Sequence, residues 1–318
     1  MRCLLVGSGG MTPQPDRFLN VVLVQLEERG YLFDCGEGTQ IAMKRWHAGF
    51  RHIALLAVTH LHGDHVLGIP GFLMARANAG AVEPLTVTGP PGIRRFVEDV
   101  TADVGFVPPY ELAFVEIDPD EPAAPAGTVR GQPREVFRDE HARLEATPLE
   151  HAVACLGYRL VEHERPGKFH PERARRLGLP EGPLWRRLQD GEAVDVGGRS
   201  IAPGEVLGPP RPGRVCAMIT DTLPCPGAYR LLEGAHIAFL EGMFLESDRD
   251  AVEGRTHLTI GKAARMAAAQ GVGRTVLTHL SPRYRDEDLP MLEREAREGN
   301  PSAEIGRDGT WYAVPLPD

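Results

Sequence analysis

Apolar residues occur along this chain in short runs separated by polar and glycine-containing turns, a pattern that predicts strands and helices in alternation. Runs rich in valine, isoleucine and leucine are predicted as strands at residues 2–7, 20–27, 31–34, 53–58, 85–88, 144–151, 156–160, 214–221, 236–241 and 274–279. Helices are predicted at residues 40–47, from 65 to about 80, and at 93–104. The first three strands are expected to pair as an antiparallel sheet.

The second half of the chain shows the same organisation as the first. Thr259 is predicted to cap a helix. Its apolar face would hold Ile260, Ala263, Ala264, Ala267 and Ala268. Apolar strands deliver the tripeptide Thr-His-Leu twice, at residues 59–61 and 278–280. This repetition suggests two related halves whose strand ends face one shared cleft.

The composition is typical of a globular protein. The chain has 318 residues, 42% hydrophobic and 25% charged, enough for one large two-sheet domain or two small ones. We expect a single domain over residues 1–318. The net charge of −9 argues against a protein that coats nucleic acid non-specifically.

The lack of a recognisable targeting signal and the pattern of cysteines predict a cytoplasmic protein. The first residues lack the features of a signal peptide, and no apolar run approaches the roughly 18 residues of a membrane span, so no membrane association is expected. The five cysteines are scattered and form no C-x-x-C motif. They are expected to be buried free thiols in a reducing cytoplasm.

The segment Thr-His-Leu-His-Gly-Asp-His follows the strand predicted at residues 53–58 and carries four potential metal ligands. His60 and His62 are two residues apart and point to the same side of a strand end. Asp64 and His65 emerge beyond a turn at a glycine and open the next helix. This spacing offers two imidazoles to one ion and a carboxylate plus an imidazole to a second, a set that suits zinc, manganese or iron. The alternative is a polar loop with three surface histidines.

This segment resembles the signature of the metallo-β-lactamase superfamily of metal-dependent hydrolases. The resemblance implies an α/β (α+β) fold, a four-layered αββα sandwich. Asp34-x-Gly, directly after a predicted strand, resembles the superfamily's second short motif, in which the acid supports the metal loop from behind. The alternative is an ordinary turn with a capping acid.

Further candidate ligands lie at three more strand ends. His151 ends one of these predicted strands. A histidine at a strand end is more often structural than a ligand. The first metal still lacks a third ligand, however, and His151 has a suitable place in the chain order. The proposed set is His60, His62 and His151 for the first metal, Asp64, His65 and His279 for the second, and Asp221 as a bridge. Seven ligands leave an open position on each metal, as catalysis requires. Two metal ions bound side by side lower the pKa of a water molecule between them from about 16 toward about 7. The resulting hydroxide suits attack on phosphorus or on a carbonyl.

Residues 164–196 differ in composition from the rest of the chain. The window 165–189 holds seven basic and two acidic residues, with short helices expected at 171–177 and 184–188. Such a segment can bury little of itself, so it is expected to project as an arm. A basic island beside Trp185 suits docking onto a phosphate backbone, and the candidate contacts are Lys168, Arg173, Arg186 and Arg187. The alternative is a solvated amphipathic insertion.

A closer resemblance covers residues 2 to 285. The segments that carry it are Phe33–Gln40, Thr59–His65, Glu150-His151 with Leu156–Arg159, Thr220–Thr222 and Leu277–Tyr284. In order along the chain they resemble ribonuclease Z, the endonuclease family that removes the 3′ trailer from precursor tRNA. Segments around Gly167 and at 182–191 resemble that family's flexible arm, which grips the tRNA elbow.

The resemblance implies roles for single residues. The seven ligands carry over, and Asp64 would also be the general base that orients the attacking water. His257 would donate a proton to the leaving 3′ oxygen, supported by Glu241; the alternative is a helix-start histidine packed near the cleft. Arg283 would contact a phosphate, or it is an ordinary surface arginine. The implied cofactors are two divalent ions, zinc or alternatively manganese, and the implied partners are precursor tRNA and a second subunit in a homodimer.

The sequence departs from the family pattern at several positions, as a side branch would. Gly242-Met243-Phe244 stands where the family usually has Ala-Thr, Arg17 and Asn20 are separated rather than adjacent, and the arm has few lysines and glycines. Three functions are therefore weighed. They are a tRNA 3′ endonuclease, a phosphodiesterase acting on a small or another nucleic-acid substrate, and a non-enzymatic binding module with a structural metal.

Overall fold

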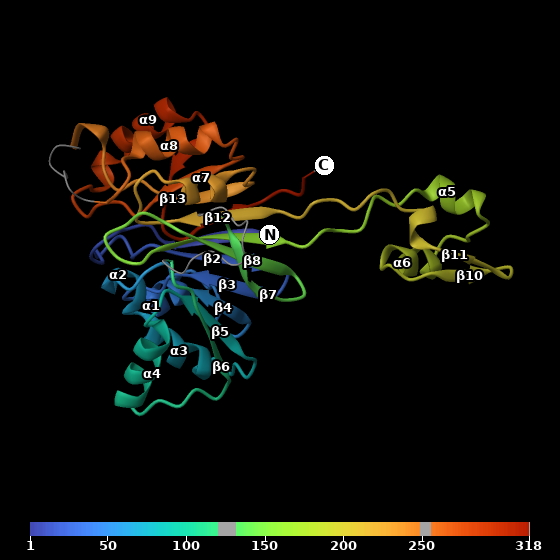
Figure 1. Cartoon of the computed structure of the whole chain (residues 1–318), viewed down its shortest axis with the longest axis horizontal. Coiled ribbons are helices and arrows are strands. Elements are labelled where there is room, and N and C mark those ends of the chain that lie inside the picture. The colour runs from blue at the N-terminus through green and yellow to red at the C-terminus, as the bar shows by residue number, and fades with distance from the viewer. Residues whose placement is uncertain (120–131, 249–255, 318) are drawn as a thin grey trace.

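Two β-sheets pack face to face and helices cover their outer faces, in a computed structural model that describes residues 1–119, 132–248 and 256–317 (Figure 1). The first sheet has the strand order β16 (Thr310–Ala313), β1 (Arg2–Gly7), β2 (Val21–Leu26), β3 (Arg29–Phe33), β4 (Ile53–Ala57), β5 (Leu85–Gly89) and β6 (Leu112–Glu116). The second has the order β15 (Ala303–Ile305), β14 (Thr275–Thr278), β13 (Ile237–Glu241), β12 (Val215–Ile219), β9 (Leu156–Glu162), β8 (Ala142–Pro148) and β7 (Arg134–Arg138). The four-layered αββα sandwich is confirmed.

The helices fall into two groups, one on each outer face (Figure 1). The first sheet is covered by α1 (Thr39–Arg45), α2 (Gly63–Val66), α3 (Ile69–Asn78) and α4 (Ile93–Asp103). The second is covered by α7 (Pro226–Leu232), α8 (Ile260–Ala269) and α9 (Leu289–Gly299), with short 3₁₀ turns at Pro203–Glu205 and Asp286–Asp288 elsewhere in the chain. Among the described residues, no helix combines the length and apolar character needed to cross a membrane.

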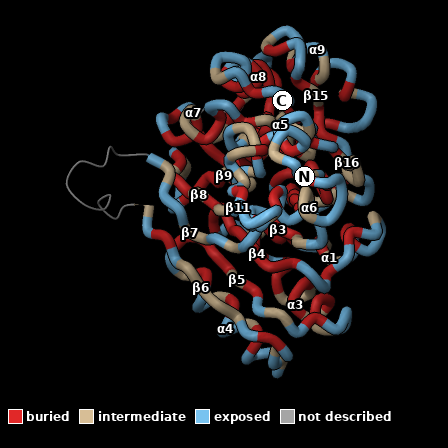
Figure 2. The backbone as a smooth tube through the Cα atoms, turned by 90° about the vertical axis from the view of Figure 1, so that its right-hand side faces the viewer, coloured by how far each residue is buried: buried red, intermediate tan, exposed pale blue. Residues whose placement is uncertain are grey.

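Three hydrophobic clusters stabilise these layers, because each sheet buries both of its faces. One lies between the sheets and includes Leu5, Phe33 and Phe239. The other two lie between each sheet and its own helices. In Figure 2 the buried positions follow the strands of both sheets.

The two halves of the sandwich share one topology. In the first sheet β1, β2 and β3 are antiparallel neighbours and β3 to β6 are parallel. In the second, β8, β9 and β12 are antiparallel and β12 to β15 are parallel. The repeated Thr-His-Leu segments do not occupy equivalent places, since one follows β4 and the other follows β14, the counterpart of β5. The equivalent strand ends are those of β3 and β12, which carry Asp34 and Asp221.

Several predicted boundaries need correction. The helix expected from residue 65 to 80 is two helices, α2 and α3, separated at Gly68, where a side chain would overlap the carbonyl of Gly36. Strand β8 ends at Pro148, so His151 lies in the following loop. On α8, Ala268 is exposed and Met266 is buried instead.

The segment between β9 and β12 projects from the sandwich (Figure 1). It contains α5 (Pro171–Arg176), α6 (Pro183–Gln189) and the hairpin β10 (Val194–Val196) and β11 (Arg199–Ile201). These elements enclose a cluster of their own that includes Ala174, Leu188 and Ile201, so the projection buries more of itself than the sequence suggested. The backbones of Arg165 and Arg211 pair at its base.

Candidate metal centre

The turn after β4 presents the first group of ligands because Asp34, at the end of β3, fastens it. The Asp34 carboxylate accepts a hydrogen bond from the backbone N–H of Thr59 (2.8 Å) and lies 2.8 Å from His65 Nδ1. With Nδ1 held there, His65 directs Nε2 towards the centre. His60 is fully buried, and its Nε2 lies 2.9 Å from Nδ1 of His62.

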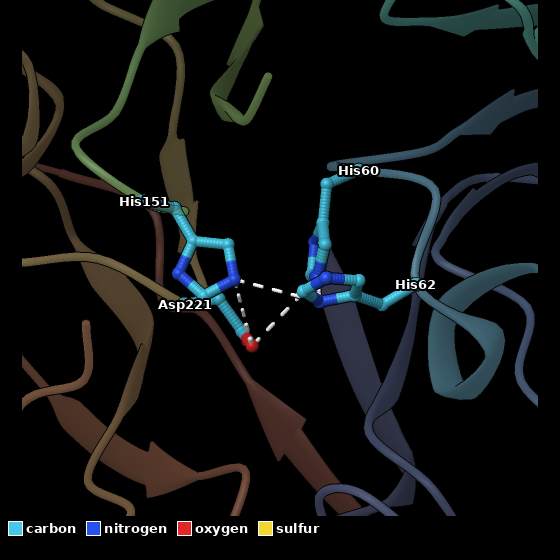
Figure 3. A group of neighbouring side chains, drawn as sticks. All are labelled: His60, His62, His151 and Asp221. Atoms are coloured by element: carbon cyan, nitrogen blue, oxygen red, sulfur yellow. Dashed lines mark hydrogen bonds and ion pairs between the residues drawn. The ribbon is translucent and has the colours of Figure 1, made fainter. Parts of the chain in front are cut away.

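Residues from the second half converge on this turn. His151 Nε2 lies 3.5 Å from His62 Nδ1 and 3.9 Å from Asp221 Oδ2. Figure 3 shows His60, His62, His151 and Asp221 pointing toward one another. A second group is Asp64, His65 and His279, and a third is Asp221, Glu241, His257 and His279; within each group the ligand atoms lie within 4.8 Å of one another. The structure therefore brings all seven predicted ligands together.

Asp221 lies between the two groups, with one carboxylate oxygen on each side. Its Oδ2 lies 3.7 Å from His60 Nε2, whereas its Oδ1 lies 3.2 Å from His279 Nε2 and 3.6 Å from His65 Nε2. Each group of candidate ligands therefore faces one oxygen of Asp221.

Unpaired polar atoms at the centre test whether these residues fit a metal. In the described part of the chain, His65 Nε2, His279 Nε2 and Asp221 Oδ1 are buried without a hydrogen-bond partner. A buried polar atom left unpaired costs about 1–3 kcal/mol, and imidazole nitrogen and carboxylate oxygen are ligands for divalent metals. The residues fit divalent metal ions.

The electrostatics of His60 and Asp221 agree with a role as metal ligands, whereas Asp34 and Asp221 raise the pKa of His65 against the effect of burial. Burial lowers the pKa of His60 well below its usual value, which favours the neutral imidazole that binds metals. Burial opposes ionisation of Asp221, but His279, His65 and His60 outweigh it and lower the pKa of that carboxyl. Both groups are thus in the protonation state that coordination requires.

Glu241, which is buried, and His257, which is partly exposed, form a pair next to these ligands. Glu241 Oε1 accepts the backbone N–H of Thr222 at 2.5 Å, and its Oε2 lies 2.9 Å from His257 Nδ1. Burial alone would lower the pKa of His257, but the Glu241 carboxylate more than offsets it, so that pKa is raised. His257 Nδ1 also lies 3.7 Å from Asp221 Oδ2.

The predicted substrate contacts lie elsewhere. Lys168, Arg173, Arg186 and Arg187 are all in the projection, away from the metal centre (Figure 1). Arg186 and Arg187 pair there with Asp190 (3.1 Å) and Glu192 (2.8 Å). Arg283 is nearer the centre, over the ring of Phe244, which itself contacts His257, and it lies 3.5 Å from Asp248.

Sequence reasoning missed three supports of the site. The backbone N–H of Met11 donates to Asp64 Oδ2 at 2.8 Å. A Cβ at Gly10 would come within 2.7 Å of the His279 ring. Thr256 Oγ1 lies 2.7 Å from His151 Nδ1, which directs Nε2 of that ring towards the ligands. The paired glycines after β1 were a signal for close approach, whereas nothing in the sequence singled out Met11 or Thr256.

The site is also a place of backbone strain. Among the described residues, six non-glycine residues have positive φ, and four of them are at this centre: Met11, Asp34, Asp221 and His279. Such conformations cost about 1–3 kcal/mol each and gather at functional sites.

Comparisons with known proteins identify the family of this chain. The family model described as "Anti-Pycsar protein Apyc1" matches residues 1–86. A curated ribonuclease Z of Treponema denticola is 36% identical over 310 residues, covering 97% of this chain and 96% of its own. That of Salinibacter ruber is 38% identical over 312 residues, covering 97% of this chain and 93% of its own. This chain belongs to the ribonuclease Z family.

A solved structure supports the same fold. The chain is similar to the short form of human tRNase Z, with a TM-score of 0.72, 22% identity, and coverage of 99% of this chain and 100% of the other. Membership in the ribonuclease Z family makes this protein a hydrolase, a metal-dependent endoribonuclease. It is therefore not the non-enzymatic module that was the third hypothesis.

Proposed function

We propose that this enzyme removes the 3′ trailer from precursor tRNA by hydrolysis of a phosphodiester bond. The observation that carries the proposal is the convergence of seven ligand side chains from both halves in a chain that is 36% identical to a ribonuclease Z over nearly its full length. Water attacks phosphorus, the bond to the 3′ oxygen breaks, and the products are a mature 3′ hydroxyl and a trailer with a 5′ phosphate.

We assign two divalent ions to the centre, zinc or alternatively manganese. His60, His62 and His151 would hold the first, Asp64, His65 and His279 the second, and Asp221 both. When bound, the ions supply positive charge that promotes ionisation of water and offsets the charge of the phosphate.

The protein's own groups divide the proton transfers between them. In this proposal Asp64 orients the attacking water and accepts its proton, and the Met11 amide, which donates to its carboxylate, supports it. Glu241 fixes Nδ1 of His257, so Nε2 is left to protonate the leaving 3′ oxygen. General acid and general base groups in this arrangement typically contribute about 10²–10⁴-fold each.

The test uses purified protein loaded with zinc or with manganese. Precursor tRNA with a labelled trailer is incubated with the enzyme, and the ends of both products are mapped. We expect a single cut that leaves a 3′ hydroxyl on the tRNA. Hydrolysis of bis(4-nitrophenyl) phosphate without any cut in precursor tRNA would contradict the proposal.

One observation favours a second candidate, a phosphodiesterase acting on a small or another nucleic-acid substrate. The basic window at 165–189 is followed by acids, so residues 164–211 hold nine basic and seven acidic residues. Arg175, Arg186 and Arg187 are each paired with an acid of the projection. The whole projection therefore attracts a phosphate backbone less strongly than the basic residues at 165–189 would by themselves.

We infer that the active form is a cytoplasmic homodimer. The projection extends away from the ligands of its own chain (Figure 1), so a bound tRNA could meet both the projection and a catalytic centre if the two belonged to different subunits. Light scattering tests the dimer. The five cysteines are buried and free, which suits a reducing compartment.

A further inference from the structure

A cavity of about 680 Å³ opens beside His151, between the loop at residues 148–155 and the first turn of α7. Most of the residues that line it are apolar, among them Pro148, Leu149, Val153 and Pro226, but polar atoms also reach its surface. Glu150 is the only acidic side chain among the described residues that line it. Cavities of this size and character bind small organic groups, and a few polar atoms determine which ones.

The wall that carries Glu150 is fixed in place. The backbone N–H of Leu149 donates to the carbonyl of Cys155 at 2.9 Å and closes the loop at its base. The backbone N–H of Glu150 donates to Thr222 Oγ1 (3.1 Å), and its backbone carbonyl accepts from the N–H of Leu223 (2.8 Å). The cavity is therefore preformed against the segment that follows Asp221.

The cavity lies nearer to His257 than to Asp64. His151, which lines it, contacts Thr256, the residue before His257, and the two imidazole rings are 5.4 Å apart. Asp64 instead groups with His65 and His279. In the proposed mechanism the cavity therefore lies nearer to His257, the proton donor to the leaving oxygen, than to Asp64.

We propose that this cavity binds the nucleobase of the nucleotide whose 3′ oxygen leaves, and that Glu150 accepts a hydrogen bond from an exocyclic amino group of that base. The inference rests on the proposed function. Adenine, cytosine and guanine offer such an amino group, whereas uracil presents carbonyl oxygens that the carboxylate repels. Gain or loss of one hydrogen bond to a charged group changes affinity by about tenfold or more, so bases with an amino group should be preferred over uracil by about that factor.

The first test uses four precursor tRNAs that differ only in the base before the cleavage site. The wild-type enzyme should show kcat/KM about tenfold lower for uracil than for adenine, and Glu150→Gln should reduce that ratio to about two. Glu98→Gln, at an exposed site on α4, is the matched control and should keep the wild-type ratio. An unchanged ratio in Glu150→Gln, or a preference for the base after the cleavage site instead, would overturn the inference.

The second test does not depend on tRNA cleavage, so it separates failure of the inference from failure of the proposed function. Calorimetric titration of the metal-loaded protein with 3′-AMP, 3′-UMP and 5′-AMP should give the tightest binding for 3′-AMP, because only a 3′-phosphate places the base on the leaving side. Val153→Trp, which fills the cavity, should weaken 3′-AMP binding about tenfold, and Val107→Trp at an 85% exposed position should not. Equal affinity of the wild type for 3′-AMP and 3′-UMP would refute the assignment.

Discussion

Glu241 connects the metal centre to the proton donor, because one of its oxygens accepts from Thr222, next to Asp221, and the other faces His257. A neutral amide at this position cannot accept from both partners. It also removes the negative charge that favours a protonated imidazole.

Glu241→Gln should therefore lower kcat on precursor tRNA by about 10²-fold. The same variant should lower turnover of bis(4-nitrophenyl) phosphate by less than about threefold, because nitrophenolate leaves without a proton. Steady-state kinetics on both substrates measure the difference, and Glu246→Gln at a surface ion pair is the control. Equal losses on the two substrates would show that Glu241 acts on the metal centre alone.

Gly10 makes a different contribution, since it gives space to the His279 ring. Gly10→Ala would place a Cβ 2.7 Å from that ring, so His279 must move away from Asp64 and Asp221. We expect zinc affinity to fall by about 10–100-fold, as when other supports of a ligand are lost. Competition with a fluorescent chelator measures it. Gly204→Ala, where a Cβ would meet nothing within 4 Å, should bind zinc like the wild type.

At the scale of elements, the loop at residues 8–18 is held against the sheet by Asp308. This carboxylate accepts hydrogen bonds from Ser8 Oγ (2.7 Å) and from the backbone N–H of Phe18 (2.6 Å). Burial nevertheless raises the pKa of Asp308 to about 6. The folded protein thus favours the protonated carboxyl more than the unfolded chain does.

This shift predicts a pH dependence of stability. Because the folded state binds the proton more tightly, its contribution is greatest below about pH 4 and is lost as pH rises through about 6, a loss of about 2–3 kcal/mol. Asp308→Asn removes the titration. Urea unfolding of both proteins measures this effect. From pH 4 to pH 7, the free energy of unfolding of the variant should rise by about 2–3 kcal/mol relative to that of the wild type. A difference independent of pH would contradict the shift.

The sequence predicted most of the strands that bury apolar runs, and with them the approximate ends of β4 and β14, but it extended β8 beyond Pro148 to His151. The β4 run followed by His60 and His62 is informative because spacing alone sets the side on which these residues lie. The supports from Met11 and Thr256 were beyond sequence reasoning, because one is a backbone amide and the other depends on a contact between residues 105 positions apart.

The repeat between halves was predicted from the wrong residues. The Thr-His-Leu match suggested it, but only strand pairing showed that the ends of β3 and β12 are equivalent. Asp34 and Asp221 both have positive φ there. Asp34 orients a ligand from behind, whereas Asp221 lies between the two groups.

At the scale of the molecule, the projection and the sandwich have separate hydrophobic clusters. Replacing residues 166–210 by a short glycine-serine linker joins Arg165 and Arg211, whose backbones are already paired. The free energy of unfolding of the sandwich should change by less than about 1 kcal/mol. Hydrolysis of bis(4-nitrophenyl) phosphate should persist, while kcat/KM for precursor tRNA falls by about 10²-fold or more, since phosphate contacts are lost.

Two double variants refine this prediction. Among the described residues, Lys168 and Arg173 have no ion pair, whereas Arg186 and Arg187 each have one. Lys168→Ala with Arg173→Ala should therefore weaken tRNA binding more than Arg186→Ala with Arg187→Ala, and the effect should shrink at high salt. Equal effects, or none, would favour the small-substrate phosphodiesterase.

The separate cluster within the projection has an evolutionary consequence. The projection has its own hydrophobic cluster and is joined to the sandwich by two chain segments that pair with each other. During evolution it can therefore be exchanged, enlarged or lost without any change in the packing of the sheets. Substrate range can then diverge between lineages while the hydrolytic centre stays the same, and a single ancestral scaffold can serve RNAs of different size.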